Sequence, residues 1–131
     1  MKEIEVVAGI IFFEDKILCV QRPEHKYQYI SQKFEFPGGK IEIGETKEAA
    51  LKRELLEELN ITPTIKSFFY TVVHSYPDFQ LTMHTFICDA KTIDLKLNEH
   101  IAFEWLTLTE LEKLDWAAAD IPVVKKMVSN G

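Results

Sequence analysis

A pair of glycines, Gly38 and Gly39, precedes the strongest helix pattern in this chain, Lys47–Leu59. Thr46 is placed to cap the start of this helix, and Asn60 stands where a helix end commonly takes the left-handed conformation. Glycine lets the backbone approach a ligand or metal closely, because it has no Cβ. The sequence therefore predicts a point of close backbone approach shortly before a well-defined helix.

Three carboxylates share one face of this predicted helix, because Glu54, Glu57 and Glu58 have the i, i+3, i+4 spacing. Like charges at this spacing destabilise a helix by about 0.2–0.5 kcal/mol per pair, and a divalent cation would offset that cost. Oxygen ligands favour Mg²⁺ or Mn²⁺. The alternative is a solvated acidic face with a surface ion pair between Arg53 and Glu57. The neighbouring flank of the helix is apolar and is predicted to contact the core; it carries Leu51, Leu55 and Leu59.

The residues around this helix favour the metal site over the solvated face. Glu45 stands six residues after Gly39, and Arg53 stands eight residues after Glu45. An arginine cannot bind a metal, but its planar fork can hold neighbouring carboxylates in position. In order, the fixed positions are Gly39, Glu45, Arg53-Glu54-Leu55, Glu57-Glu58 and Ile61.

This spacing resembles the Nudix box, G-x5-E-x7-R-E-U-x-E-E-x-G-U, where U is aliphatic. Asn60 replaces the last glycine, and we expect a small effect on stability and no loss of chemistry. Outside the box, segments 8–11, 34–41, 105 and 119–122 look like the MutT branch of the family. The resemblance implies Mg²⁺-dependent hydrolysis (Mn²⁺ is the other candidate) of a nucleoside triphosphate to the monophosphate and pyrophosphate, with 8-oxo-dGTP as the first candidate substrate.

Two other functions remain open. Segments 114–116 and 119–122 also look like proteins that act on CTP or modified dCTP. A Nudix module that binds nucleotides without catalysis is a further alternative. It is disfavoured because such a module could lose a carboxylate of the box, whereas this chain keeps all of Glu45, Glu54, Glu57 and Glu58.

The resemblance also implies roles for individual residues. The metal ligands would be the Gly39 carbonyl, Glu54, Glu57, Glu58 and Glu99. The general base would be Glu54 or Glu99, and the sequence does not choose between them. Arg53 would hold the carboxylates, and the structural members of the box would be Gly38 and Glu45.

Substrate contacts are expected from residues at and beyond the box. Lys40 and Arg22 are candidates for binding phosphate oxygens, although Arg22 also fits a solvated arginine at a strand end. Asp120 is the candidate for reading the base edge; the simpler alternative is that it caps the last helix. Phe36 and Phe79 are candidates for stacking on the base, and each could equally be a core residue.

The remaining pattern predicts an α/β (α+β) fold, a Nudix-type α/β/α sandwich around a mixed β-sheet. Loops are predicted at 22–33 and 38–45. The predicted strands are 4–13, 17–21, 34–36, 64–75, 80–90 and 103–106. The predicted helices are 47–59, 107–114 and 121–128.

Length and charge limit the remaining possibilities. The 131 residues fit a single domain over 1–131, and the net charge of −6 disfavours binding to polymeric nucleic acid. No apolar run is long enough to span a membrane, so we expect a cytoplasmic protein without a membrane partner. Cys19 and Cys88 are predicted to be buried thiols. We expect a monomer or a weak dimer.

Overall fold

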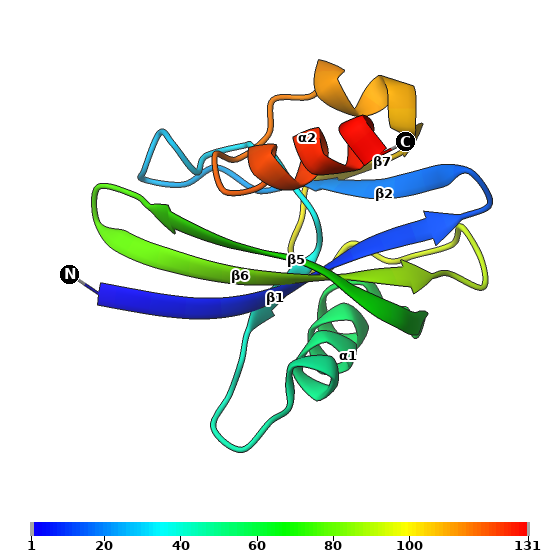
Figure 1. The fold of residues 1–131 in the computed structure, drawn as a ribbon, viewed down its shortest axis with the longest axis horizontal. Coiled ribbons are helices and arrows are strands. Elements are labelled where there is room, and N and C mark those ends of the chain that lie inside the picture. Colours follow the sequence, from blue (N-terminus) through cyan, green and yellow to red (C-terminus); the bar gives the residue numbers. More distant parts are fainter. Residues whose placement is uncertain (1, 131) are drawn as a thin grey trace.

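The computed structural model describes residues 2–130, whose strands form one mixed sheet of seven strands (Figure 1). The main path of the sheet runs β3-β2-β1-β6-β5. Two short strands attach to it, with β4 paired to β1 and β7 paired to β2. The strand bounds are β1 Lys2–Phe13, β2 Lys16–Gln21, β3 Phe34–Glu35, β4 Gly38–Lys40, β5 Thr64–Ser75, β6 Phe79–Asp89 and β7 Ala102–Thr107.

Strand β1 is the centre of this sheet. It pairs in parallel with β6 along almost its whole length, from Lys2 opposite Phe79 to Phe12 opposite Asp89. Its other edge pairs antiparallel with β4 and, beyond that, with the start of β2. The pairing with β1 therefore places β4, which contains the glycine pair, next to the central strand of the sheet.

Helices cover the sheet on both sides (Figure 1). Helix α1, Lys47–Leu59, packs on one face. Helix α2, Ile121–Asn130, lies over the other face together with the 3₁₀ helix η1, Leu108–Lys113. This arrangement confirms the predicted sandwich around a mixed sheet.

The two faces of the sheet bury two separate apolar cores, which follow from the alternation of side chains along a strand. In β1, Val7 and Ile11 pack on the α1 side, whereas Ala8 and Ile10 pack on the α2 side. The predicted apolar flank of α1 is confirmed: three leucines are fully buried, namely Leu51, Leu55 and Leu59. The core on the α1 side packs the carboxylate-bearing helix against the central strand.

Both cysteines are buried and free, as predicted. Burial raises the pKa of Cys19 and of Cys88 to about 12, so both side chains are uncharged thiols in the folded protein. They belong to the cores and take no part in the site described below.

Two predicted elements differ from the structure. The loop predicted over 38–45 is wrong for its first three residues, because Gly38–Lys40 forms β4. A Cβ on Gly38 would overlap the Val7 carbonyl, so the glycine is what lets the two strands approach. The helix predicted over 107–114 is the shorter 3₁₀ helix η1, and the other predicted elements differ only at their ends.

The ends of α1 are capped as the sequence predicts. The Thr46 hydroxyl accepts a hydrogen bond from the Ala49 amide at 3.1 Å. Asn60 takes the left-handed conformation with φ of 56°, and its amide donates to carbonyls of the last helical turn. Among residues 2–130, no helix is both long and apolar enough to cross a membrane.

Candidate active site

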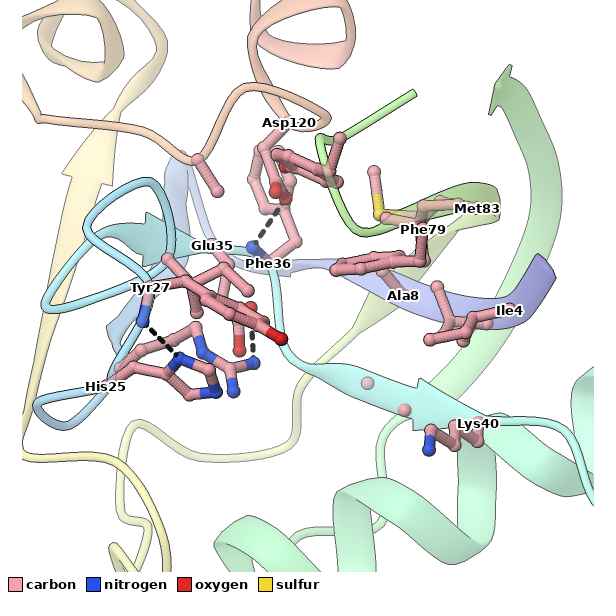
Figure 2. A pocket seen from close by; sticks show the side chains of 18 of the residues that line it. Ile4, Ala8, His25, Tyr27, Glu35, Phe36, Lys40, Phe79, Met83 and Asp120 are labelled. Carbon is pink, nitrogen blue, oxygen red and sulfur yellow. Dashed lines mark hydrogen bonds and ion pairs between the residues drawn. The ribbon is translucent and has the colours of Figure 1, made fainter. Parts of the chain in front are cut away.

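A cavity of about 680 Å³ opens beside β1, β4 and the end of α1, and it brings together most of the predicted site residues. Figure 2 shows Ile4, Ala8, Phe79 and Met83 forming an apolar part, with Lys40 toward α1. The cavity is within the size range of small-molecule sites. The predicted residues that line it are Arg22, Phe36, Gly38, Gly39, Lys40, Glu58, Phe79, Glu99 and Asp120.

Arg53 links the carboxylates of the box. Its guanidinium donates twice to Glu45, from Nε at 2.7 Å and from Nη2 at 2.9 Å. Nη1 donates to Glu54 at 2.8 Å and to Glu57 at 3.4 Å, and Nη2 also reaches the Lys40 carbonyl at 3.0 Å. The hydrogen bonds from Arg53, followed by the Glu42 amide, lower the pKa of Glu45 to about 2. Hydrogen bonds to Glu45 and then to Glu54 raise the pKa of Arg53, so the Arg53–Glu45 ion pair is charged at neutral pH.

Glu54 lies against Gly39, which joins the helix to the glycine strand. A Cβ on Gly39 would overlap the Glu54 carboxylate, so a larger residue at this point would displace that side chain. Burial raises the pKa of Glu54 above its ordinary value, and the hydrogen bond from Arg53 opposes this shift. The carboxylate and the Gly39 backbone are therefore brought together at the edge of the cavity.

Glu58 is the most buried carboxylate of the helix, with 7% of its surface exposed. Burial first, and then a hydrogen bond with Glu99, raises the pKa of Glu58 to about 9. Its Oε1 is buried and has no hydrogen-bond partner among the described residues. A buried, unpaired carboxylate oxygen is costly unless a ligand satisfies it.

These residues fit a divalent cation in the chemistry of their donors. All are oxygen donors, as Mg²⁺ prefers, and Glu58, with its unpaired oxygen, lines the cavity. Within residues 2–130, no three His, Cys, Asp or Glu side chains converge into a closed ligand set. Arg53 holds Glu54 through an ion pair of 2.8 Å, and Glu57 is exposed to solvent.

The two predicted phosphate-binding cations lie at different parts of the cavity. Lys40 follows the glycine pair and is exposed, and its ammonium has no ion pair among the described residues. Arg22 directly follows β2, and its Nη1 lies 3.4 Å from Oε1 of Glu35. Nε of Arg22 is buried without a hydrogen-bond partner in the described chain, so it can still donate to a ligand.

Asp120 is 4% exposed and lies at the inner end of the cavity (Figure 2). Its Oδ1 accepts a hydrogen bond from the Phe36 amide at 3.1 Å, so this carboxyl contacts the residue after β3 and not the first amides of α2. Burial raises the pKa of Asp120 well above its ordinary value, and the nearby Glu35 adds to the shift. A neutral carboxyl can both donate and accept a hydrogen bond.

The two predicted stacking residues have different surroundings. Phe36 is a core side chain that packs on Trp116 with ring centroids 4.7 Å apart. Phe79 is half-buried in the apolar part of the cavity and packs on Tyr76 at 5.1 Å. Of the two rings, Phe79 is the one with surface available to a ligand.

Sequence reasoning missed Glu35 and His100, which line this cavity, and Asn98, which contacts the end of α1. Nε2 of His100 lies 3.0 Å from Oε2 of Glu35, which also faces Arg22. Asn98 donates from its side chain to the Glu57 carbonyl at 2.8 Å. The only available signal was their position beside Glu99, in Asn98-Glu99-His100, because no local spacing links residues 35 and 100.

Comparisons with known proteins agree with this geometry. Residues 3–127 match the family model of the NUDIX domain. The 8-oxo-dGTP diphosphatase of Escherichia coli K12 is 35% identical, over 97% of this chain and 98% of its own length. The CTP pyrophosphohydrolase of the same organism is also 35% identical, over 98% of this chain and 94% of its own length.

Solved structures give the same result. The MutT protein of methicillin-resistant Staphylococcus aureus 252, described as a Nudix hydrolase, is 40% identical with a TM-score of 0.76, and the match covers all of both chains. The E. coli ORF135 protein is 34% identical with a TM-score of 0.82, over 98% of this chain and 91% of its own. The chain therefore belongs to the NUDIX family of hydrolases.

Proposed function

We propose that this protein hydrolyses a nucleoside triphosphate to the monophosphate and pyrophosphate, with 8-oxo-dGTP as its first candidate substrate. The observation that carries the proposal is that one cavity has both a charged part and an apolar part. Glu58 and Lys40 lie near α1, and the rest of the cavity is lined by Arg22, by apolar side chains and by the buried Asp120. The near full-length similarity to an 8-oxo-dGTP diphosphatase supports it.

Hydrolases of this family generally need a divalent metal. We assign Mg²⁺, with Mn²⁺ as a substitute, to Glu54, Glu57, Glu58, Glu99 and the Gly39 carbonyl. When bound, the metal supplies positive charge that neutralises the phosphate oxygens and favours attack by water. The buried unpaired oxygen of Glu58 supports this assignment, because an ionised Glu58 needs a cation nearby.

The remaining steps belong to the side chains. Lys40 and Arg22 bind phosphate oxygens, which orients the chain of phosphates along the cavity. Glu54 or Glu99 accepts the proton of the attacking water. Arg53 does not touch the substrate in this mechanism; it fixes Glu54 through the 2.8 Å hydrogen bond.

A cytidine triphosphate, CTP or modified dCTP, is the second candidate. The CTP pyrophosphohydrolase of E. coli is as similar to this chain as the 8-oxo-dGTP diphosphatase. The chemistry of Asp120 is compatible with both bases. A neutral carboxyl can pair with N4–H and N3 of cytosine, or with N7–H and O6 of 8-oxoguanine, since each edge offers one donor and one acceptor.

The same chemistry disfavours unmodified guanine. Its N7–O6 edge has two acceptors, and its N1–N2 edge has two donors, so neither edge matches a neutral carboxyl. A mismatched polar group in a buried pocket reduces affinity strongly. For a protonated Asp120, GTP and dGTP should therefore be poor substrates.

The deciding experiment compares kcat/KM for 8-oxo-dGTP, dGTP, CTP, modified dCTP and dATP with Mg²⁺, with pyrophosphate release as the readout. The proposal expects monophosphate and pyrophosphate as products, with 8-oxo-dGTP preferred at least tenfold over dGTP. Best turnover of CTP or modified dCTP would select the second candidate. Tight nucleotide binding without turnover would indicate the non-catalytic module.

The cellular setting follows as a further proposal. We infer a cytoplasmic protein that acts on free nucleotides as a monomer or weak dimer, without polymeric nucleic acid or membrane partners. The net charge of −6 supports the first of these absences, since nucleic-acid-binding domains carry basic surfaces.

A further inference from the structure

The segment that carries Glu99 is attached at two points, one on each side of that residue. On the side before it, Asn98 contacts the end of α1. On the side after it, His100 contacts Glu35 of β3. Glu99 itself makes no hydrogen bond to the backbone of either element, and its side chain lines the cavity.

The first attachment uses groups that every helix leaves free. The last carbonyls of a helix have no partner within the helix. Here the Asn98 amide donates to the Glu58 carbonyl at 3.0 Å, and the Asn98 side chain donates to the Glu57 carbonyl at 2.8 Å. The residues that accept these bonds are the same ones whose side chains are proposed to bind metal. These two hydrogen bonds thus fix the backbone next to Glu99 directly to α1.

The second attachment is buried. The His100 side chain is 4% exposed, and its Nε2 lies 3.0 Å from Oε2 of Glu35. The following amide, of Ile101, donates to the Gln21 carbonyl at 3.0 Å, next to Arg22. The segment after Glu99 is therefore fixed to the strands that carry the proposed phosphate-binding arginine.

We propose that Asn98 and His100 are positioning residues that hold Glu99 opposite Glu54 and Glu58. This inference rests on the proposed function, in which Glu99 is a metal ligand or the general base. The two attachments fix the segment of Glu99 to α1 on one side and to β2 and β3 on the other. The carboxylate is therefore already in place when the substrate binds. Preorganisation of this kind is a recognised source of catalytic rate.

The central test is a double-mutant cycle of His100→Ala and Glu99→Gln. In the wild-type background we expect His100→Ala to lower kcat by about 10–100-fold, as is common for groups that orient a ligand, with KM changed by less than about threefold. In the Glu99→Gln background, the same substitution should change kcat by less than about twofold. Losses that multiply would overturn the inference, because His100 would then act without Glu99. A Glu99→Gln protein with wild-type kcat would also overturn it.

Conservative and matched variants separate positioning from folding. His100→Gln keeps a donor near the place of Nε2, so it should recover most of the lost kcat. His84→Ala is the matched control: it removes a histidine whose Nε2 lies 2.6 Å from Glu5, outside this cavity, and should leave kcat within about twofold. Asn98→Ala tests the exposed attachment. It should lower kcat when Glu99 is present and leave kcat nearly unchanged in the Glu99→Gln protein. An equal loss in His84→Ala would assign the effect to stability.

A measurement on the metal-free protein decides the question independently of turnover. ¹⁵N heteronuclear NOE values for the amides of residues 98–101 should fall in His100→Ala and Asn98→Ala, and stay unchanged in His84→Ala. Unchanged values in all three variants would overturn the inference. If the wild-type protein hydrolyses no nucleotide, the proposed function fails, and these values still report whether the two residues hold the segment.

Discussion

At the scale of single residues, the geometry of the site depends most on Arg53. Its one guanidinium contacts Glu45, Glu54 and Glu57 and the carbonyl of Lys40. These partners come from the loop before α1, from α1 itself and from β4. A planar fork with five donors can serve several acceptors at once, whereas a lysine presents a single point charge.

Arg53→Lys should lower kcat by about 10–100-fold while the protein remains folded. The charge stays, but the bonds to Glu45 and Glu54 cannot be made together, and Glu54 loses its fixed position. Steady-state kinetics and thermal unfolding measure the two effects separately. Lys52→Ala, an exposed neighbour on α1, is the control. A kcat within twofold of wild type would show that Arg53 acts only through its charge.

Glu45 should contribute to stability at neutral pH and lose that contribution in acid. Its pKa is lowered to about 2 from an ordinary value of 4.5, mainly by Arg53. A carboxylate with a lowered pKa stabilises the folded state above about pH 4.5, and this stabilisation disappears as the pH falls toward 2. The free energy of unfolding, measured in urea, should therefore fall less steeply between pH 6 and pH 3 for Glu45→Gln than for the wild type. Parallel curves for the two proteins would contradict the assignment.

Glu58 should have the opposite effect in the metal-free protein. Because its pKa is raised to about 9, the unfolded chain gives up this proton at lower pH than the folded one does. Its contribution to the free energy of unfolding in EDTA should thus fall as the pH rises from about 5 to 9, by at most about 1.4 kcal/mol per pH unit. Glu58→Gln should remove this slope. An identical slope in that variant would show that the shift lies elsewhere.

At the scale of elements, the sequence identified α1 best. Its periodicity, its Thr46 cap and its left-handed end at Asn60 are all local features, and all three are confirmed. β4 could not be identified this way, because its pairing with β1 joins residues 30 to 34 positions apart and glycines are typical of loops. For the same reason, no local pattern separates the 3₁₀ helix η1 from a short α-helix.

The end of α1 offers a direct test of backbone conformation. Asn60 has φ of 56°, where glycine is unstrained and alanine is not. Asn60→Gly should leave the free energy of unfolding within about 1 kcal/mol of wild type, and Asn60→Ala should lower it by about 1 kcal/mol. Calorimetry measures both, and kcat should stay near wild type. An alanine variant as stable as the glycine variant would contradict this account.

At the scale of the whole molecule, the candidate site divides into a part that sequence could predict and a part that it could not. The box carboxylates lie within one helix and its preceding loop, so their spacing defines them. The base end of the cavity combines β1, β6, the segment before β3 and the segment before α2. Contacts such as Glu35 with His100, or Asp120 with the Phe36 amide, join residues 65 and 84 positions apart and depend on the folded sheet.

Because the proposed metal site lies between α1, β4 and the Glu99 segment, metal binding should stabilise the molecule as a whole. A ligand at 100 times its dissociation constant stabilises a folded protein by about 2.7 kcal/mol. Mg²⁺ or Mn²⁺ should raise the unfolding temperature, and Glu57→Gln should reduce that rise and lower Mg²⁺-dependent turnover. Full turnover and an unchanged rise in Glu57→Gln would show that the metal lies elsewhere.

The parallel pairing of β1 with β6 also has a consequence for how the protein is made. Residues 2–12 of β1 each pair with a residue 77 positions later, from Lys2 with Phe79 to Phe12 with Asp89. During synthesis, β1 therefore leaves the ribosome before β6, and its apolar segment stays unpaired on that edge until β6 has been made. Pairings between such distant segments also form slowly. The strand that lies at the centre of the finished sheet is therefore made well before the strand that completes it.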